Sequence, residues 1–277
     1  MTPRVAEPRL VQTRLGRLAV RSYGDAAAPP AVLWHSMFVD SSSWARVVPT
    51  LSEHRRLVVV DGPGYGDSDE LAAVTTMTEC ADAALDLLDG LDLPLVDWVG
   101  NAWGGHVAYQ LDCAAPGRLR SLVAISAPPQ RLPMRDRAKV SLLRPVLATA
   151  GPVPFLLDLV AEAQLTDFSR AADVQAVQVI RDSMRRQSRR SLSTTVASFV
   201  IGRRDLTRQA RLGTAPALFV ATDDRGEWGP READAAAAAR PGARALTVSW
   251  ARTLVPLEQP AVLARRIVEF WTEVERA

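Results

Sequence analysis

Val99-Gly100-Asn101-Ala102-Trp103-Gly104-Gly105 stands before the midpoint of the chain and is its most informative stretch. An apolar run precedes it and a helical pattern follows it, so a sharp turn between a strand and a helix is predicted. Small residues flank the central position, as in a nucleophile elbow, a turn that holds one side chain out into a reaction site. Here that side chain is the methyl group of Ala102, which cannot attack a substrate.

Short apolar runs, small-residue turns and helical patterns alternate on both sides of this turn. This alternation predicts an α/β fold. Between residues 131 and 211 the pattern is helical and contains no clear strand. We therefore expect a helical cap over residues 131–211, inserted into a core formed by residues 1–130 and 212–277.

Composition narrows the classes of protein to consider. The formal net charge of +2 is too balanced to argue for nucleic acid or an anionic membrane as a partner. Hydrophobic residues make up 48% of the 277 residues, which is ordinary for a globular protein. The first residues lack the apolar core of a signal peptide, and the two cysteines lack a C-x-x-C spacing. These features predict a cytoplasmic protein.

Four further motifs occur in a consistent order. They are Leu33-Trp34-His35-Ser36-Met37, Trp44, the glycine-rich loop Asp61-Gly62-Pro63-Gly64-Tyr65-Gly66-Asp67-Ser68, and Pro256-Leu257-Glu258-Gln259-Pro260. With the elbow, they resemble the α/β-hydrolase superfamily over essentially the whole chain. The segment Ala102-Trp103-Gly104-Gly105 is similar to the Asp-Trp-Gly-Gly elbow of epoxide hydrolases and haloalkane dehalogenases. The resemblance implies a mostly parallel sheet of about eight strands with helices on both faces.

The resemblance also implies a nucleophile, an acid and a histidine, in that order along the chain. Ala102 stands at the nucleophile's position, and Asp223 or, with better spacing, Asp224 stands at the acid's. Thr253 stands where the histidine belongs. No shift of the alignment supplies a base there, because the last histidine of the chain is His106. The catalytic triad is therefore degenerate in sequence.

Several groups at this site still have possible roles. The backbone N–H groups of Met37 and Trp103 are expected to form an oxyanion hole, since backbone donors survive side-chain replacement. Asp224 is the candidate catalytic base. The predicted substrate-binding residues are His35, Ser36, Ala102, Trp228 and Thr253. Trp103 and Trp228 would suit an aromatic ligand.

Three functional hypotheses follow from these residues. The first is a cofactor-independent, non-hydrolytic enzyme of natural-product or antibiotic biosynthesis, in which the oxyanion hole stabilises an enolate during isomerisation, epimerisation, cyclisation or carbon–carbon bond formation. The second is a catalytically silent protein that binds a small molecule in the same pocket. The third is a hydrolase with an unrecognised means of activating water, or an inactivated hydrolase. We expect a small-molecule ligand and no metal, cofactor, nucleic acid or membrane partner, and the oligomeric state is not assigned.

Overall fold

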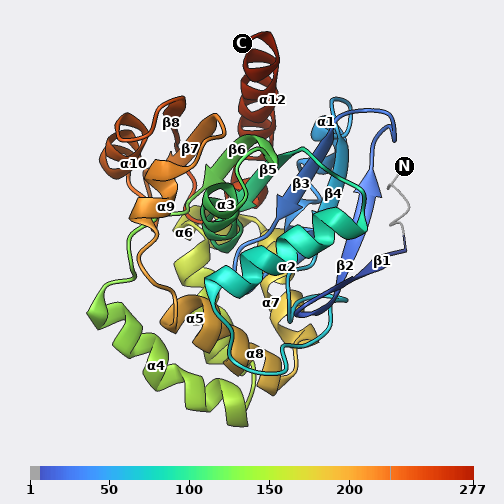
Figure 1. Cartoon of the computed structure of the whole chain (residues 1–277). Coiled ribbons are helices and arrows are strands. Elements are labelled where there is room, and N and C mark those ends of the chain that lie inside the picture. The colour runs from blue at the N-terminus through green and yellow to red at the C-terminus, as the bar shows by residue number, and fades with distance from the viewer. Residues whose placement is uncertain (1–6, 225) are drawn as a thin grey trace.

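The computed structural model describes residues 7–224 and 226–277. Its central feature is an eight-stranded sheet with the strand order β1-β2-β4-β3-β5-β6-β7-β8 (Figure 1). Strand β2 pairs antiparallel with β1 and β4, and the remaining pairs are parallel. The strands are β1 (Arg9–Thr13), β2 (Gly16–Tyr23), β3 (Pro30–Trp34), β4 (Arg56–Val60), β5 (Val96–Asn101), β6 (Leu119–Ile125), β7 (Ala217–Thr222) and β8 (Ala243–Val248).

Helices cover both faces of this sheet. On one face lie α2 (Met77–Gly90), α3 (Trp103–Ala114), α9 (Thr207–Leu212) and α10 (Pro230–Ala238), and on the other α1 (Val48–Leu51) and α12 (Pro260–Arg276). Strand residues alternate between the two resulting cores. On β3, for example, Val32 and Trp34 face one core while Ala31 and Leu33 face the other. This period of two is what a strand buried on both faces requires.

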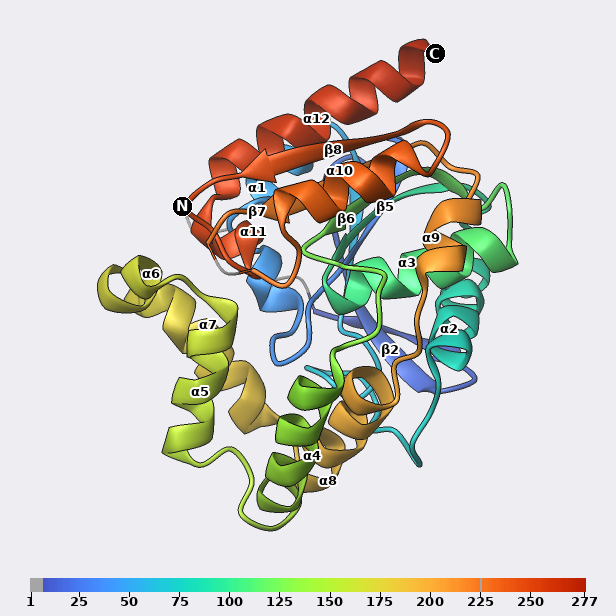
Figure 2. The ribbon, with the colours of Figure 1, turned by 90° about the vertical axis from the view of Figure 1, so that its left-hand side faces the viewer.

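A group of helices stands between β6 and β7 and lies to one side of the sheet (Figure 2). It contains α4 (Met134–Thr149), α5 (Pro154–Gln164), α6 (Asp167–Ala172), α7 (Val174–Arg186), α8 (Arg189–Thr195) and the π-helix η2 (Val196–Ile201). All residues between Ile125 and Ala217 are described, and none of them is in a strand. The division into a core and a cap at residues 131–211 stays a prediction.

The predicted fold class is confirmed. The segment between β3 and β4 contains a 3-10 turn, η1 (Ser41–Trp44), followed by α1, and Asp40 caps η1 by accepting from the N–H of Ser42. The last helix is interrupted at Gln259, between α11 (Val255–Glu258) and α12. Gln259 precedes Pro260 and leaves the helical region, with φ −132° and ψ 53°, because the proline ring clashes with a helical residue before it.

No helix in the described part of the chain is both long enough and apolar enough to cross a membrane.

Candidate active site

The predicted elbow is present in the structure. β5 ends at Asn101, Ala102 has φ 45° and ψ −101°, and α3 begins at Trp103. The N–H of Ala102 donates to the carbonyl oxygen of Ile125 on the neighbouring strand, at 2.7 Å. A positive φ is unfavourable for alanine because the Cβ crowds the backbone, so the turn keeps its strain although the side chain is inert.

Gly104 allows the start of α3 to pack closely against β3. A Cβ added at Gly104 would lie 2.1 Å from the carbonyl oxygen of Trp34, far inside van der Waals contact. The close approach fixes the direction in which the first backbone N–H groups of α3 point. The N–H of Trp103, in the first turn, has no intrahelical acceptor, as at any helix N-terminus. It is therefore available to a ligand oxygen, as the oxyanion-hole prediction requires.

Met37, the second predicted oxyanion donor, lies in the loop that follows β3. This loop is buried and braced by His35. The Nδ1–H of His35 donates to the carbonyl oxygen of Ser36 at 2.7 Å, and its Nε2 accepts from the N–H of Gly62 at 2.9 Å. Burial lowers the pKa of His35, which favours the neutral ring that this pattern of one donor and one acceptor needs.

The position expected for a histidine is occupied by Thr253, which is fully buried. Its N–H donates to the carbonyl oxygen of Gln164 at 3.1 Å, and its carbonyl oxygen accepts from the side-chain amide of Asn101 at 2.9 Å. Within the described residues, Thr253 Oγ1 and Asn101 Oδ1 have no hydrogen-bond partner. Buried oxygens of this kind are places where a water molecule is commonly held.

The candidate acids lie in the loop after β7. Asp223 accepts from the N–H of Trp250 at 3.0 Å. Asp224 Oδ1 lies 3.3 Å from Arg252 Nη2, and its carbonyl oxygen accepts from Arg252 Nε at 3.1 Å. Arg252 also contacts Asp167 of α6 at 3.4 Å. The acid's position is thus part of a charged junction between the β7 loop and the helices beyond β6.

Aromatic rings close the space around the elbow. Trp103 stacks on Phe199 of η2 with ring centroids 4.6 Å apart, and it also contacts the rings of Trp34, His35 and Tyr65. Ala102 itself is only 5% exposed. Trp228, the other predicted pocket wall, is fully buried and packs against Phe219 of β7.

Three residues that connect the helices between β6 and β7 to the rest of this site were not predicted from the sequence. Phe199 covers Trp103. The side chain of Gln164 lies 3.4 Å from Ser36 Oγ, at the edge of hydrogen-bonding distance. Glu258 accepts from the N–H and hydroxyl of Thr166 and from the N–H of Arg252, each at 2.8 Å. Only Glu258 stood in a recognised motif. Helical periodicity does not reveal which residue of a distant helix lies over the elbow.

The roles predicted for these side chains stay predictions. The structure places Ala102 and Trp103, the first residue of α3, at the carboxyl end of β5, and the hydrogen bond from Asn101 to Thr253 brings the segment after β8 to the same edge, where open α/β sheets bind ligands. Among the described residues there is no group of three His, Cys, Asp or Glu side chains that could hold a metal ion.

A family model described as "Alpha/beta hydrolase family" matches residues 31–266. The chain therefore belongs to the alpha/beta hydrolase family. Among its relatives, the 2-hydroxy-6-oxononadienedioate/2-hydroxy-6-oxononatrienedioate hydrolase 1 of Dechloromonas aromatica is 28% identical over 236 residues, covering 79% of this chain and 80% of that protein. The 2-hydroxy-6-oxo-2,4-heptadienoate hydrolase of Pseudomonas putida is 33% identical over 116 residues, covering 40% of this chain and 42% of that protein. For several such relatives, the match spans less than half of their length.

Two solved structures share the fold closely. An esterase from Thermogutta terrifontis matches with a TM-score of 0.88 at 21% identity, over 97% of this chain and 99% of that one. An enol-lactonase from Burkholderia xenovorans LB400 matches with a TM-score of 0.85, also at 21% identity, over 95% of this chain and all of that one.

The predicted non-hydrolytic enzyme of natural-product biosynthesis is contradicted by these comparisons. The relatives are named hydrolases and an enol-lactonase, which points to hydrolytic chemistry. The prediction was wrong because it inferred a new reaction from two missing side chains. A backbone oxyanion hole serves ester and lactone hydrolysis as well as it serves an enolate.

Proposed function

We propose that this protein hydrolyses an ester or lactone by direct attack of water, without a covalent acyl-enzyme intermediate. The observation that carries the proposal is the elbow itself, which keeps its strained backbone turn while Ala102 removes the nucleophile. Membership of a hydrolase family supports the choice of a carbonyl substrate. On this proposal the protein lacks a working triad and is not an ordinary serine esterase.

The reaction begins when a water oxygen bonds to the substrate's carbonyl carbon. The carbonyl oxygen becomes an oxyanion, stabilised by the N–H groups of Trp103 and Met37. The water's proton passes to the carboxylate of Asp224, which is our proposed base. The tetrahedral intermediate then expels the alkoxide or enolate, which takes up the proton and leaves a carboxylic acid. The polar oxygens of Thr253 and Asn101 are suited to hold the attacking water, because they are buried and lack a protein partner within the described residues.

The rate acceleration that such a site can give limits the class of substrate. In proteases that lose their triad, the oxyanion hole and binding alone still give about 10³–10⁴-fold over water. Without a histidine to protonate the leaving group, an alkyl ester is a poor substrate at this level of catalysis. We therefore propose activated substrates, namely aryl esters and enol lactones, whose leaving groups are stable as anions.

The test is a comparison of p-nitrophenyl acetate, an enol lactone and ethyl acetate. We expect about 10³-fold acceleration over buffer for the first two, no pre-steady-state burst, and no labelling by a fluorophosphonate probe. Labelling of one serine would show that the nucleophile lies elsewhere. Acceleration below tenfold for both activated substrates would defeat the proposal.

Two variants sharpen this test. Asp224→Asn nearly keeps the shape of the side chain, so it is expected to lower kcat while leaving KM nearly unchanged. An unchanged kcat would assign Asp224 a purely structural role. Ala102→Ser alone is expected to remain unlabelled and no more active, because Thr253 cannot accept the proton of the serine.

A second candidate function is binding of such a carbonyl compound without turnover. The stacking of Phe199 on Trp103 favours it, because this contact closes the site over the elbow. Calorimetric binding of an aryl ester, displaced by Ala102→Phe and accompanied by no product, would support this candidate over hydrolysis.

The finer assignments of the site belong to the same proposal. They are a ligand contacting His35, Ser36, Ala102, Trp228 and Thr253, a cap at residues 131–211, and a place near the epoxide hydrolase and haloalkane dehalogenase branch. The Trp103-Gly104-Gly105 sequence after residue 102 supports that branch.

A further inference from the structure

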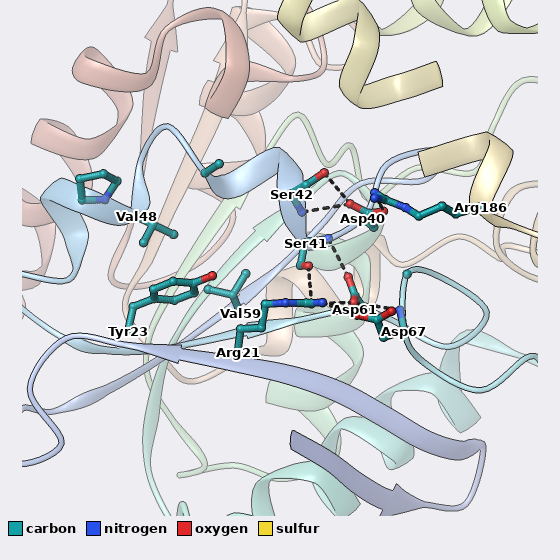
Figure 3. A pocket seen from close by; sticks show the side chains of 13 residues that line it. Arg21, Tyr23, Asp40, Ser41, Ser42, Val48, Val59, Asp61, Asp67 and Arg186 are labelled. Carbon is teal, nitrogen blue, oxygen red and sulfur yellow. Dashed lines mark hydrogen bonds and ion pairs between the residues drawn. The ribbon is translucent and has the colours of Figure 1, made fainter. Parts of the chain in front are cut away.

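A cavity of about 530 Å³ lies away from the elbow (Figure 3). It is bounded by β2, β4, the η1–α1 segment, the loop after β4 and the last residue of α7. We call it the outer pocket. Its volume falls within the range of sites that hold small molecules.

One end of the outer pocket is apolar. Val48, Pro49 and Ala45 of the η1–α1 segment face it, with Val59 of β4 and the ring of Tyr23 of β2. Tyr23 is only partly buried, so its ring is accessible to a ligand. This end suits a hydrocarbon or aryl group, whose burial is favourable in proportion to the area removed from water.

The other end is charged, with Arg21, Asp40, Asp61, Asp67 and Arg186 (Figure 3). Three carboxylates against two guanidinium groups give this lining a net charge of −1. Both arginines are already paired: Arg21 with Asp61 at 2.9 Å and with Asp67, and Arg186 with Asp40. The excess charge in the pocket is therefore negative.

The three carboxylates differ in their availability. Asp61 accepts from the N–H groups of Ser41 and Asp67 as well as from Arg21. Asp40 is nearly buried; its burial opposes ionisation, but the bonds from Ser42 and the charge of Arg186 outweigh this and lower its pKa. The side chain of Asp67 is 53% exposed. Asp67 is thus the carboxylate that a ligand can reach.

We propose that the outer pocket binds a small organic cation with an apolar body, of the arylalkylamine class. The aryl group lies between Tyr23 and Val48, and the ammonium group lies beside Asp67. This proposal does not depend on the proposed hydrolysis, because it uses none of the residues assigned to that reaction.

The experiment compares three ligands of similar size by calorimetry or NMR titration: 2-phenylethylamine, 2-phenylethanol and 3-phenylpropanoate. We expect the amine to bind most tightly and the carboxylate least. Equal affinities, or a preference for the carboxylate, would overturn the proposal.

Two pairs of variants locate the site. Ala45→Trp fills the apolar end from an exposed position and is expected to abolish amine binding, whereas Thr50→Trp, exposed nearby but outside the pocket, is expected to leave it intact. Asp67→Asn is expected to weaken binding of the amine by about fivefold, as for a half-exposed ion pair, and to leave binding of the alcohol nearly unchanged. Glu70→Gln removes an exposed charge from the same loop and serves as the control. Amine binding that survives Ala45→Trp would place the ligand elsewhere.

Discussion

At the elbow, four rings surround Trp103 and leave Ala102 almost without contact with solvent, whereas at the outer pocket ion pairs line an accessible cavity. The elbow owes its form to close packing of backbone and aromatic side chains. The outer pocket owes its form to charged side chains on four separate segments. The contrast teaches that a backbone geometry typical of catalysis and an accessible volume are separate properties, which this chain places in different parts of the molecule. Substitutions in the two regions should therefore lower the free energy of unfolding by different amounts.

The largest expected effect is that of Phe199→Ala. Removal of this nearly buried ring leaves a cavity beside Trp103, and such truncations lower the free energy of unfolding by about 3–5 kcal/mol. Urea denaturation measures the change. Phe168→Ala is the matched control, because Phe168 is 78% exposed on α6 and its loss should matter little. Equal effects of the two substitutions would mean that the elbow is not closed by packing.

Gly104→Ala tests how much the close backbone packing at the elbow contributes to stability. The added methyl group meets the carbonyl oxygen of Trp34, so we expect a loss of about 3 kcal/mol from overpacking. At Gly117 the positive φ of 87° is unfavourable for alanine, but no atom lies within 4 Å of the added Cβ. Gly117→Ala is therefore expected to cost only about 1 kcal/mol. A larger loss at Gly104, measured in urea, reports the close approach of α3 to β3, because Gly104 has the close neighbour and Gly117 has only the positive φ.

Acidification should destabilise the elbow side of the molecule through its buried histidines. Burial lowers the pKa of His106 well below its usual value, and the charge of Arg203 lowers it further. The folded state therefore holds the neutral ring, while the unfolded chain binds a proton below about pH 6.5. This contribution to stability is complete above that pH and is lost as the pH falls toward the folded pKa, by up to about 1.4 kcal/mol per pH unit.

His106→Gln is expected to make the fall of unfolding free energy between pH 6.5 and 5 shallower. The control is His54→Gln, since His54 is exposed on the surface. Identical slopes for wild type and His106→Gln would show that the ring is not neutral in the folded protein.

The smallest expected effect is at the outer pocket. Arg186→Gln removes the partner of Asp40, but the arginine is half exposed and Ser42 still donates to the carboxylate. We expect a loss of about 1 kcal/mol or less in urea denaturation. A loss as large as that of Phe199→Ala would erase the contrast between the two regions.

The sequence predicted the parts of this molecule that depend on local chemistry. The glycines around Ala102 and the loop from Asp61 to Ser68 predicted their turns, because few other residues allow such close approach. The positions of Phe199 and Gln164 against the elbow were not predictable, since they depend on how a whole set of helices packs. The outer pocket was not predictable for the same reason, because Arg21 and Arg186 in its lining are 165 positions apart in the sequence. The reaction was mispredicted because missing side chains do not specify what replaces them.

The carboxylate of Glu258 has a consequence for how the molecule opens. It binds the start of α6 and the Arg252 backbone together, and Arg46 adds a link to Asp173 at the start of α7. These links lie at one end of the helices between β6 and β7. If those helices move to admit a ligand, the α6–α7 end is therefore the axis of rotation and η2 is the edge that swings away. Motion of this kind would lift Phe199 off Trp103 while the hydrogen bonds of Glu258 stay in place, but it would also break the bond from the N–H of Thr75 to Ser198 Oγ, so opening the elbow means losing a stack of two rings together with that hydrogen bond.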